Sequence, residues 1–194
     1  MSQCGACALF APQGHGMVAR GRPGGPCPWK IVSYSERPER APGGGHMPST
    51  HVSLHFHIVF STKNREPLIA AEWEPRLYAY LGGCIRTLGG VALEINGMPD
   101  HVHLLIGLKA THRPSDVLRD TKTPSSGWVH DVIKFRKFQW QEGYGAFTVG
   151  PSTIESVRRY IRRQKIHHRK KSFQEEYVEL LEMSGVKYDP QFLW

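Results

Sequence analysis

Apolar and polar side chains begin to alternate at about residue 52, which marks the start of a folded region. Residues 52–60 alternate and are rich in strand formers, so they are predicted to form a β-strand. A turn is predicted over residues 97–100, where glycine, proline and aspartate occur close together. Three further segments are predicted as strands: 91–96, 101–108 and 138–149, the last being clearest over 145–149.

Four other segments are predicted as helices: 72–88, 115–133, 154–170 and 172–185. Gly89-Gly90 ends the first helix, and Pro124 is expected to break or kink the second, which restarts toward Ile133. A Ser-x-x-Glu capping box opens each of the last two helices, at residues 152–155 and 172–175.

The order of these elements indicates the fold class. A strand, a helix, two strands, a helix and a strand follow one another, and two helices come last. This order predicts an α+β fold: a ferredoxin-like antiparallel sheet with helices on one face and a C-terminal helical extension.

Residues 1–46 have a different composition from the rest of the chain. Glycine and proline make up 15 of these 46 residues, and the segment shows neither a helical nor a strand period. We therefore predict a disordered extension over 1–46 and a folded domain over 47–194, with Met47 as an alternative start. This segment also contains Cys4, Cys7, Cys27 and His15, which could form a zinc site. Their spacing matches no standard zinc motif, which favours the alternative that they bind no metal.

The charge of the chain favours a polyanionic partner. The 194 residues contain 25 lysines and arginines against 17 acidic residues, a net charge of +8 and a pI of about 9.5. Nucleic acid is the first candidate and an anionic membrane surface the second. No apolar run is long enough to span a membrane, no secretory signal is visible, and four cysteines do not make a disulfide framework. We therefore expect a cytoplasmic protein.

His101 and His103 are candidate metal ligands. Side chains at i and i+2 of a strand leave the same face, so both imidazoles project together while Val102 faces the other way. Two histidines on one face form half of a metal site, and a third ligand must come from elsewhere. A pair of packed or hydrogen-bonded histidines is the alternative at this point.

A second group of candidate residues lies in the helix that follows Pro151. Tyr160 and Gln164 are four positions apart and share a helix face. No acidic residue occurs between Ser156 and Ser172, although this stretch contains eight lysines and arginines. A phosphate-binding helix and a solvated basic face are both consistent with this pattern.

Taken together, these motifs resemble those of the single-tyrosine HUH transposases. These are the TnpA-like transposases of small insertion sequences, and they include the REP-associated tyrosine transposases. The resemblance covers about residues 51–194 and rests on the segments 100–105 (DHVHLL), 160–164 (YIRRQ) and 167–169 (HHR), with support from 57–63, 140–150 and 172–176.

The resemblance implies roles for the candidate residues. His101 and His103 would bind a divalent metal, Mg²⁺ or Mn²⁺, with Gln164 as third ligand. Tyr160 would attack single-stranded DNA and form a 5′-phosphotyrosine link that is later reversed, so that no nucleotide cofactor is needed. A cation beside the phosphate would lower the pKa of the phenol, which otherwise lies near 10.

The same resemblance implies the partners. Members act on hairpin-bearing single strands, usually as homodimers in which the tyrosine helix can serve the partner's histidines, and the bound protein would be nucleoid-associated. The expected DNA-binding residues are Lys63, Arg65, Arg158, Arg159, Arg162, Arg163, His167, His168, Arg169 and Lys170.

Three other functions fit part of this pattern. A catalytically idle or domesticated nucleic-acid-binding protein fits the charge, but the strands lack the aromatic pair of RNA-recognition sheets. A nucleotide hydrolase with a His-x-His-x-His motif is disfavoured, because residue 105 of this chain, where the third histidine would stand, is leucine. A replication initiator or relaxase would share the chemistry but tends to be longer. His55 and His57 add a second His-x-His, which leaves a four-histidine site as a minor alternative.

Overall fold

The computed structural model describes residues 15–19, 29–33 and 51–193, which belong to two units. In the smaller unit, strands β1 (His15–Ala19) and β2 (Trp29–Ser33) pair antiparallel, although the sequence showed no strand pattern there. The rest of the N-terminal extension, including the candidate zinc ligands Cys4, Cys7 and Cys27, lies outside the described residues. Its disorder and the domain boundary at residue 47 therefore stay predictions.

The larger unit is built on a four-stranded antiparallel sheet with the strand order β4-β5-β3-β6. This is the strand order of the ferredoxin-like fold, so the predicted fold class is confirmed. Its elements are β3 (Leu54–Ser61), α1 (Glu74–Thr87), β4 (Val91–Met98), β5 (His101–Leu108), α2 (Pro114–Trp128), β6 (Gly145–Val149), α3 (Ile154–Arg162), α4 (Gln164–His167) and α5 (Phe173–Met183). No helix in these described residues has the length and apolar character needed to cross a bilayer.

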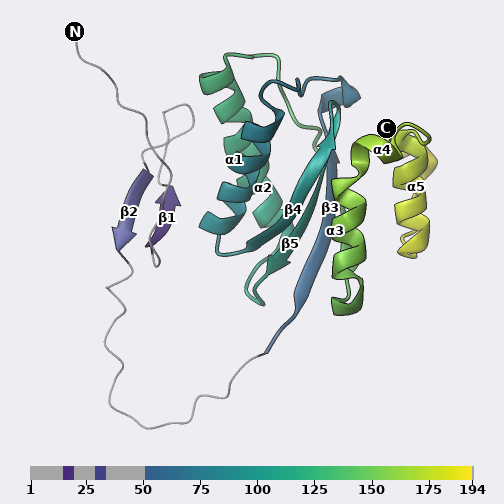
Figure 1. The fold of residues 1–194 in the computed structure, drawn as a ribbon, viewed down its shortest axis with the longest axis horizontal. Coiled ribbons are helices and arrows are strands. Elements are labelled where there is room, and N and C mark those ends of the chain that lie inside the picture. Colours follow the sequence, from purple (N-terminus) through teal and green to yellow (C-terminus); the bar gives the residue numbers. More distant parts are fainter. Residues whose placement is uncertain (1–14, 20–28, 34–50, 194) are drawn as a thin grey trace. The chain divides into compact units, whose positions relative to one another are not determined.

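Helices cover both faces of this sheet, as Figure 1 shows. Helices α1 and α2 lie on one face, where Val102 and Leu104 of β5 join the main hydrophobic core. On the opposite face Ile161 of α3 packs on Leu105 of β5. Alternate side chains of β5 thus point to the face covered by α3, the helix that carries Tyr160, as the sequence pattern predicted.

Helix α5 packs on the same face as α3. Its residues Phe173 and Leu181 form a small buried cluster with Val59 of β3 and Phe147 of β6. The predicted capping box opens this helix, since the Glu175 amide donates to the Ser172 hydroxyl and the Glu175 carboxylate accepts from the Ser172 amide. Positions on the first turn of α5 are therefore fixed relative to the sheet.

Two local predictions were wrong. Helix α2 continues through Pro124 to Trp128 and then passes into one π-helical turn, Val129–Ile133. Packing of Val117 and Leu118 into the core outweighs the hydrogen bond that a proline removes. Residues 152–155 form no capping box: a 3₁₀ turn, Pro151–Thr153, precedes α3, and the helix is interrupted at Arg163 instead of continuing to residue 170.

The turn that leads into β5 depends on a glycine. A Cβ atom on Gly97 would lie 2.2 Å from the His101 carbonyl oxygen and 2.8 Å from the Val102 Cα. A Cβ atom cannot be accommodated this close to backbone atoms, so only glycine fits at position 97. Gly97 therefore allows the close approach of β4 to β5 at the residue where the histidine pair begins.

Candidate metal centre and nucleophile

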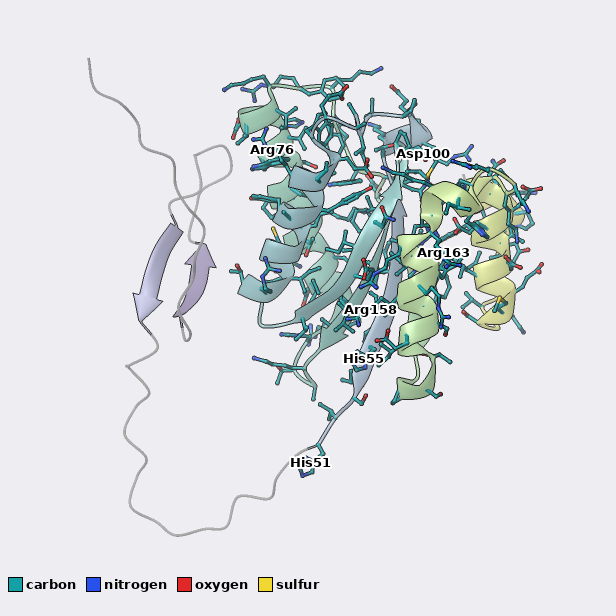
Figure 2. All side chains as sticks on the ribbon, in the orientation of Figure 1. His51, His55, Arg76, Asp100, Arg158 and Arg163 are labelled. Atoms are coloured by element: carbon teal, nitrogen blue, oxygen red, sulfur yellow. The ribbon has the colours of Figure 1, made fainter. Side chains whose placement is uncertain are left out.

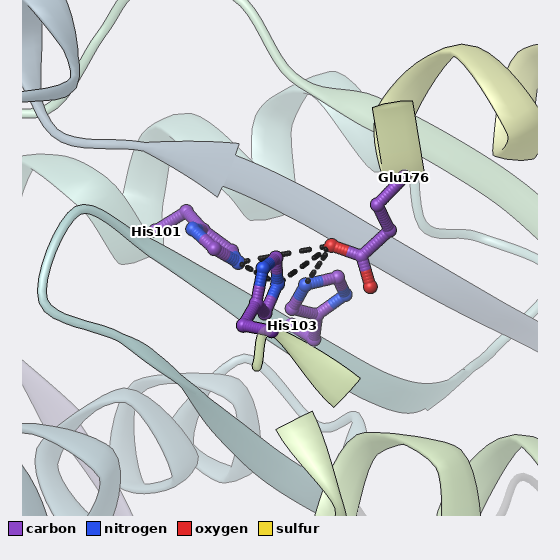
Figure 3. A group of neighbouring side chains, drawn as sticks. His101, His103 and Glu176 are labelled. Carbon is purple, nitrogen blue, oxygen red and sulfur yellow. Dashed lines mark hydrogen bonds and ion pairs between the residues drawn. The ribbon is translucent and has the colours of Figure 1, made fainter. Parts of the chain in front are cut away.

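The two histidines of β5 are buried on the face covered by α3 and α5. His101 and His103 are 1% and 0% exposed, and the centroids of their rings lie 5.1 Å apart. Figure 3 shows both imidazoles pointing toward the carboxylate of Glu176, which comes from α5. The pair is thus part of a cluster that includes the C-terminal helices.

The hydrogen bonds of these histidines direct their Nε2 atoms into the cluster. Asp100 accepts a 2.7 Å hydrogen bond from Nδ1 of His101. Burial would raise the pKa of the Asp100 carboxyl, but this bond, the charges of His101 and His168 and a backbone hydrogen bond together outweigh it and lower the pKa. On the other histidine, Nδ1 of His103 lies 2.9 Å from Nε2 of buried His57. Burial and the neighbouring His103 lower the pKa of His57 to about 3, and burial lowers that of His103 to about 4. Burial therefore favours the neutral form of His57 and of His103, and a neutral imidazole has a lone pair that can bind a cation.

His168 supplies a third imidazole. Its Nδ1 donates to the Lys171 carbonyl oxygen, which can only accept, and its Nε2 lies 3.1 Å from Nε2 of His101. Two lone pairs at this distance repel unless a proton or a metal ion lies between them. Burial alone would lower the pKa of His168, but the hydrogen bond and the charge of Glu176 outweigh it and raise the pKa above its usual value.

Glu176 is the centre of the site. This fully buried carboxylate places Oε2 3.0 Å from Nε2 of His168, 3.4 Å from that of His103 and 3.8 Å from that of His101. Burial would raise the pKa of the carboxyl, but His103, His168 and Tyr160 outweigh it and hold the pKa well below its usual range. The carboxylate is therefore charged at neutral pH.

The other oxygen of Glu176 faces the tyrosine helix. Its Oε1 accepts hydrogen bonds from the Tyr160 hydroxyl and, at 2.9 Å, from Nε2 of Gln164. Tyr160 and Gln164 thus point to one place although α3 and α4 are interrupted between them. Burial first, and Glu176 second, raise the pKa of the Tyr160 phenol, so it is protonated when metal is absent.

Four donor atoms of this cluster fit a divalent metal. Nitrogen atoms of His101, His103 and His168 and an oxygen of Glu176 lie within 4.8 Å of one another. A metal bonded to each donor at about 2.1 Å would hold neighbouring donors roughly 3.0–3.4 Å apart, close to several of the observed separations. Nε2 of His103 and Oε2 of Glu176 are buried and make no hydrogen bond within the described residues. We call these four side chains the metal cluster.

The expected third ligand, Gln164, lies beside this cluster. It is buried, and its Oε1 atom makes no hydrogen bond to any residue that the structure describes.

Three imidazoles with one carboxylate suit Mn²⁺ or another transition ion better than Mg²⁺, which prefers oxygen ligands.

The predicted DNA-binding residues lie in three places. Lys63 and Arg65 belong to a 3₁₀ turn after β3, whereas His168 lies in the metal cluster. The remaining seven follow α3, α4 and the turn after α4: Arg158, Arg159, Arg162, Arg163, His167, Arg169 and Lys170. Figure 2 labels Arg158 and Arg163 at successive levels of the tyrosine helix.

Sequence reasoning missed two residues of the site. Glu176 comes twelve positions after Gln164 and beyond a turn, so no spacing rule pointed to it. The sequence pattern marks His57 only as part of a second His-x-His with His55. The structure places His57 against His103, whereas His55 makes its side-chain hydrogen bond with Ser53, outside the metal cluster.

The chain belongs to the family of IS200-like transposases. The family described as "Transposase IS200 like" matches residues 50–164, which is more than half of the chain. The matched segment includes the histidine pair, Tyr160 and Gln164, while His168 and Glu176 lie beyond its end. The predicted family is therefore confirmed.

Two solved structures are similar in fold. One is a protein of Deinococcus radiodurans R1 described as a candidate transposase, 23% identical, with 62% of this chain and 97% of that chain covered and a TM-score of 0.48. The other is a REP-associated tyrosine transposase bound to a REP hairpin, 13% identical, with 64% and 74% covered and a TM-score of 0.48. The comparison with curated proteins gives no match.

Proposed function

We propose that this protein cleaves and rejoins single-stranded DNA through a 5′-phosphotyrosine intermediate with the help of a divalent metal. One observation carries the proposal. The Tyr160 hydroxyl and the Nε2 atoms of the histidines meet at the two oxygens of one buried carboxylate, Glu176. A nucleophile and a metal centre that share a side chain can act on the same phosphate.

The metal cluster would hold Mn²⁺ or Mg²⁺, with Gln164 Oε1 as a further available ligand. A bound divalent ion would polarise the scissile phosphate and stabilise the charge that develops on its oxygens. Asp100 and His57 orient the ligand imidazoles from outside, as hydrogen-bond partners of metal-bound histidines commonly do.

Tyr160 is the proposed nucleophile. As its Oη attacks phosphorus, the phenol proton passes to Glu176 Oε1, which already accepts a hydrogen bond from it. A bond forms between Oη and phosphorus, the bond from phosphorus to the 3′ oxygen breaks, and that oxygen takes up a proton from water and leaves as a hydroxyl. A 3′-hydroxyl reverses these steps, which conserves the phosphodiester bond energy and requires no nucleotide cofactor.

Hairpin-bearing single-stranded DNA is the proposed substrate, and a homodimer the proposed working form. The ten predicted DNA-binding residues are the candidates for backbone contacts. The position of Tyr160 beside the histidines of its own chain supports cleavage in cis as part of this proposal.

The test is the covalent adduct. Wild-type protein incubated with Mn²⁺ and a labelled hairpin oligonucleotide should yield a protein–DNA band on a denaturing gel. Tyr160→Phe and His101→Ala should give no band, and Tyr144→Phe, outside the cluster, should give the wild-type amount. Gln164→Ala should reduce the band by about ten- to a hundredfold, since water can replace an amide ligand.

Labelling that persists in Tyr160→Phe would show that another residue is the nucleophile. Tyr144 and Tyr177 would then be tested next. Binding of the oligonucleotide without any adduct would instead favour a catalytically idle or domesticated DNA-binding protein.

A further inference from the structure

We propose that a pocket beside Tyr160 binds one nucleotide of the single strand and holds its phosphate between Arg159 and Arg163. The pocket has a volume of about 320 Å³ and is lined by Ser156, Arg159, Tyr160, Arg163, Ile166 and His167. The inference rests on the proposed function, since it names the part of the DNA substrate that is bound next to the nucleophile.

The cations of the tyrosine helix divide into two sets. Arg158 donates to Glu155 at 2.9 Å, and Arg162 donates to Glu94 of β4 at 2.8 Å. Their charges are compensated within the protein. Lys165 is compensated in the same way by Glu74 of α1, at 2.8 Å.

Arg159 and Arg163 form the other set. Both are exposed, and neither forms an ion pair with any residue in the described part of the chain. Arg159 lies in α3 and Arg163 at the interruption that follows, and both side chains line the pocket. Two uncompensated guanidiniums in one pocket favour a bound anion, and phosphate accepts paired hydrogen bonds from arginine.

The remaining lining points to a nucleotide rather than to a bare anion. His167 also lines the pocket, although its Nε2 atom is buried and lies 3.8 Å from Oε1 of Glu176. Ile166 is 60% exposed, and with the Tyr160 ring it offers apolar surface to a sugar or a base. The volume also falls in the range of small-molecule sites, roughly 300–1,000 Å³, and exceeds the need of a phosphate alone.

The position of the pocket sets the place of this nucleotide on the strand. Tyr160 lines the pocket while its hydroxyl contacts Glu176 at the metal cluster. The bound nucleotide is therefore adjacent to the phosphate that is cut. Holding it would place the scissile phosphate against the hydroxyl, which is a positioning effect.

The experiment compares charge-matched double variants of the full chain. Binding of a fluorescent oligothymidylate of about 20 nucleotides is measured by anisotropy in EDTA over a series of salt concentrations. The variant Arg159→Gln/Arg163→Gln removes the pocket cations. The variant Arg158→Gln/Arg162→Gln removes the compensated cations of the same helix, and a third double variant, at Arg119 and Arg136, removes two cations elsewhere, each paired with aspartate.

We expect the pocket variant to lose at least about tenfold in affinity, and its log–log salt slope to become shallower by about 0.7, for the one phosphate that is no longer neutralised. The Arg158/Arg162 variant should lose clearly less, and Arg119→Gln/Arg136→Gln should bind as wild type. Arg159→Lys/Arg163→Lys keeps the charge and should retain most of the salt slope while losing part of the affinity.

Equal losses in the pocket variant and the Arg158/Arg162 variant would overturn the proposal, because binding would then follow total charge. Duplex DNA that competes as well as the single strand would overturn it too. These outcomes are separate from the adduct test, which needs metal. A wild-type protein that forms adducts while its pocket variant binds normally would refute the pocket alone. A wild-type protein that binds neither the oligothymidylate nor the hairpin oligonucleotide of the adduct test would refute the proposed function.

Discussion

Replacement of Glu176 by glutamine tests the centre of the site most directly. The change keeps the size of the side chain and removes its charge. A glutamine has one oxygen, so it cannot accept from Tyr160 and Gln164 on one side while offering an anionic oxygen to the three histidines on the other. Glu176→Gln should therefore weaken metal binding while the fold is retained.

The magnitude follows from the contacts. Without metal, the variant loses the charge opposite His168, 3.0 Å away, and we expect a loss of about 1–2 kcal/mol in the free energy of unfolding. Mutation of a residue that only supports a metal ligand typically weakens metal binding by about ten- to a hundredfold. Loss of the charge of a ligand itself should therefore weaken metal binding by about a hundredfold or more.

Thermal unfolding with and without Mn²⁺ measures both effects. At a Mn²⁺ concentration of about 100 times the wild-type Kd, binding stabilises wild type by about 2.7 kcal/mol, but a variant with hundredfold weaker binding by only about 0.4 kcal/mol. At about 2–4 °C per kcal/mol, the metal-induced rise in Tm falls from about 5–11 °C to about 1–2 °C.

Glu175→Gln is the matched control. Its side chain accepts from the Ser172 amide in the capping box, away from the cluster, so it should lower the base Tm slightly and keep the full metal-induced rise. A Glu176→Gln protein with the wild-type rise would refute the assignment of Glu176 as a ligand.

Three other outcomes are expected. His57→Phe should weaken Mn²⁺ binding by about ten- to a hundredfold in the same titration, because His103 loses its hydrogen-bond partner, whereas His55→Phe should not; equal affinities would contradict the role of His57. Burial lowers the pKa of Lys122 from 10.5 to about 8. Between these two pH values the folded state binds fewer protons than the unfolded state, so the contribution of Lys122 to the free energy of unfolding rises with pH. Urea midpoints measured across the window should therefore rise more in wild type than in Lys122→Met, and the same change in both proteins would count against this. A chain beginning at Met47 should keep the Tm and adduct yield of the full chain; a loss of several degrees would argue that residues 1–46 are ordered.

The sheet and its histidine pair could be predicted from sequence because both depend on local periodicity. Alternation along residues 101–108 fixes which side chains share a face, whatever packs there. Tyr160 and Gln164 were also accessible, because four residues of helix bring two side chains together. The structure preserves this pairing even though the helix is interrupted at Arg163.

The rest of the site depends on packing between distant segments, which no local pattern encodes. Glu176 reaches the histidines because Phe173 and Leu181 bury one side of α5 against the sheet. The pairing of Arg162 with Glu94 likewise joins residues 68 positions apart. Sequence reasoning could count the cations of the helix, but it could not tell which of them the protein itself neutralises.

Gly97 has a consequence for how related sequences diverge. Its constraint comes from the backbone of the hairpin, where any Cβ would overlap the His101 carbonyl, and it does not depend on chemistry at the metal cluster. Copies of this gene in which the proposed activity is lost are free to change the histidines and the tyrosine, yet they still need the hairpin to fold. Among descendants of this sequence, we therefore expect glycine at position 97 to outlast the proposed catalytic residues, so that decayed copies are recognised by a kept glycine beside altered histidines.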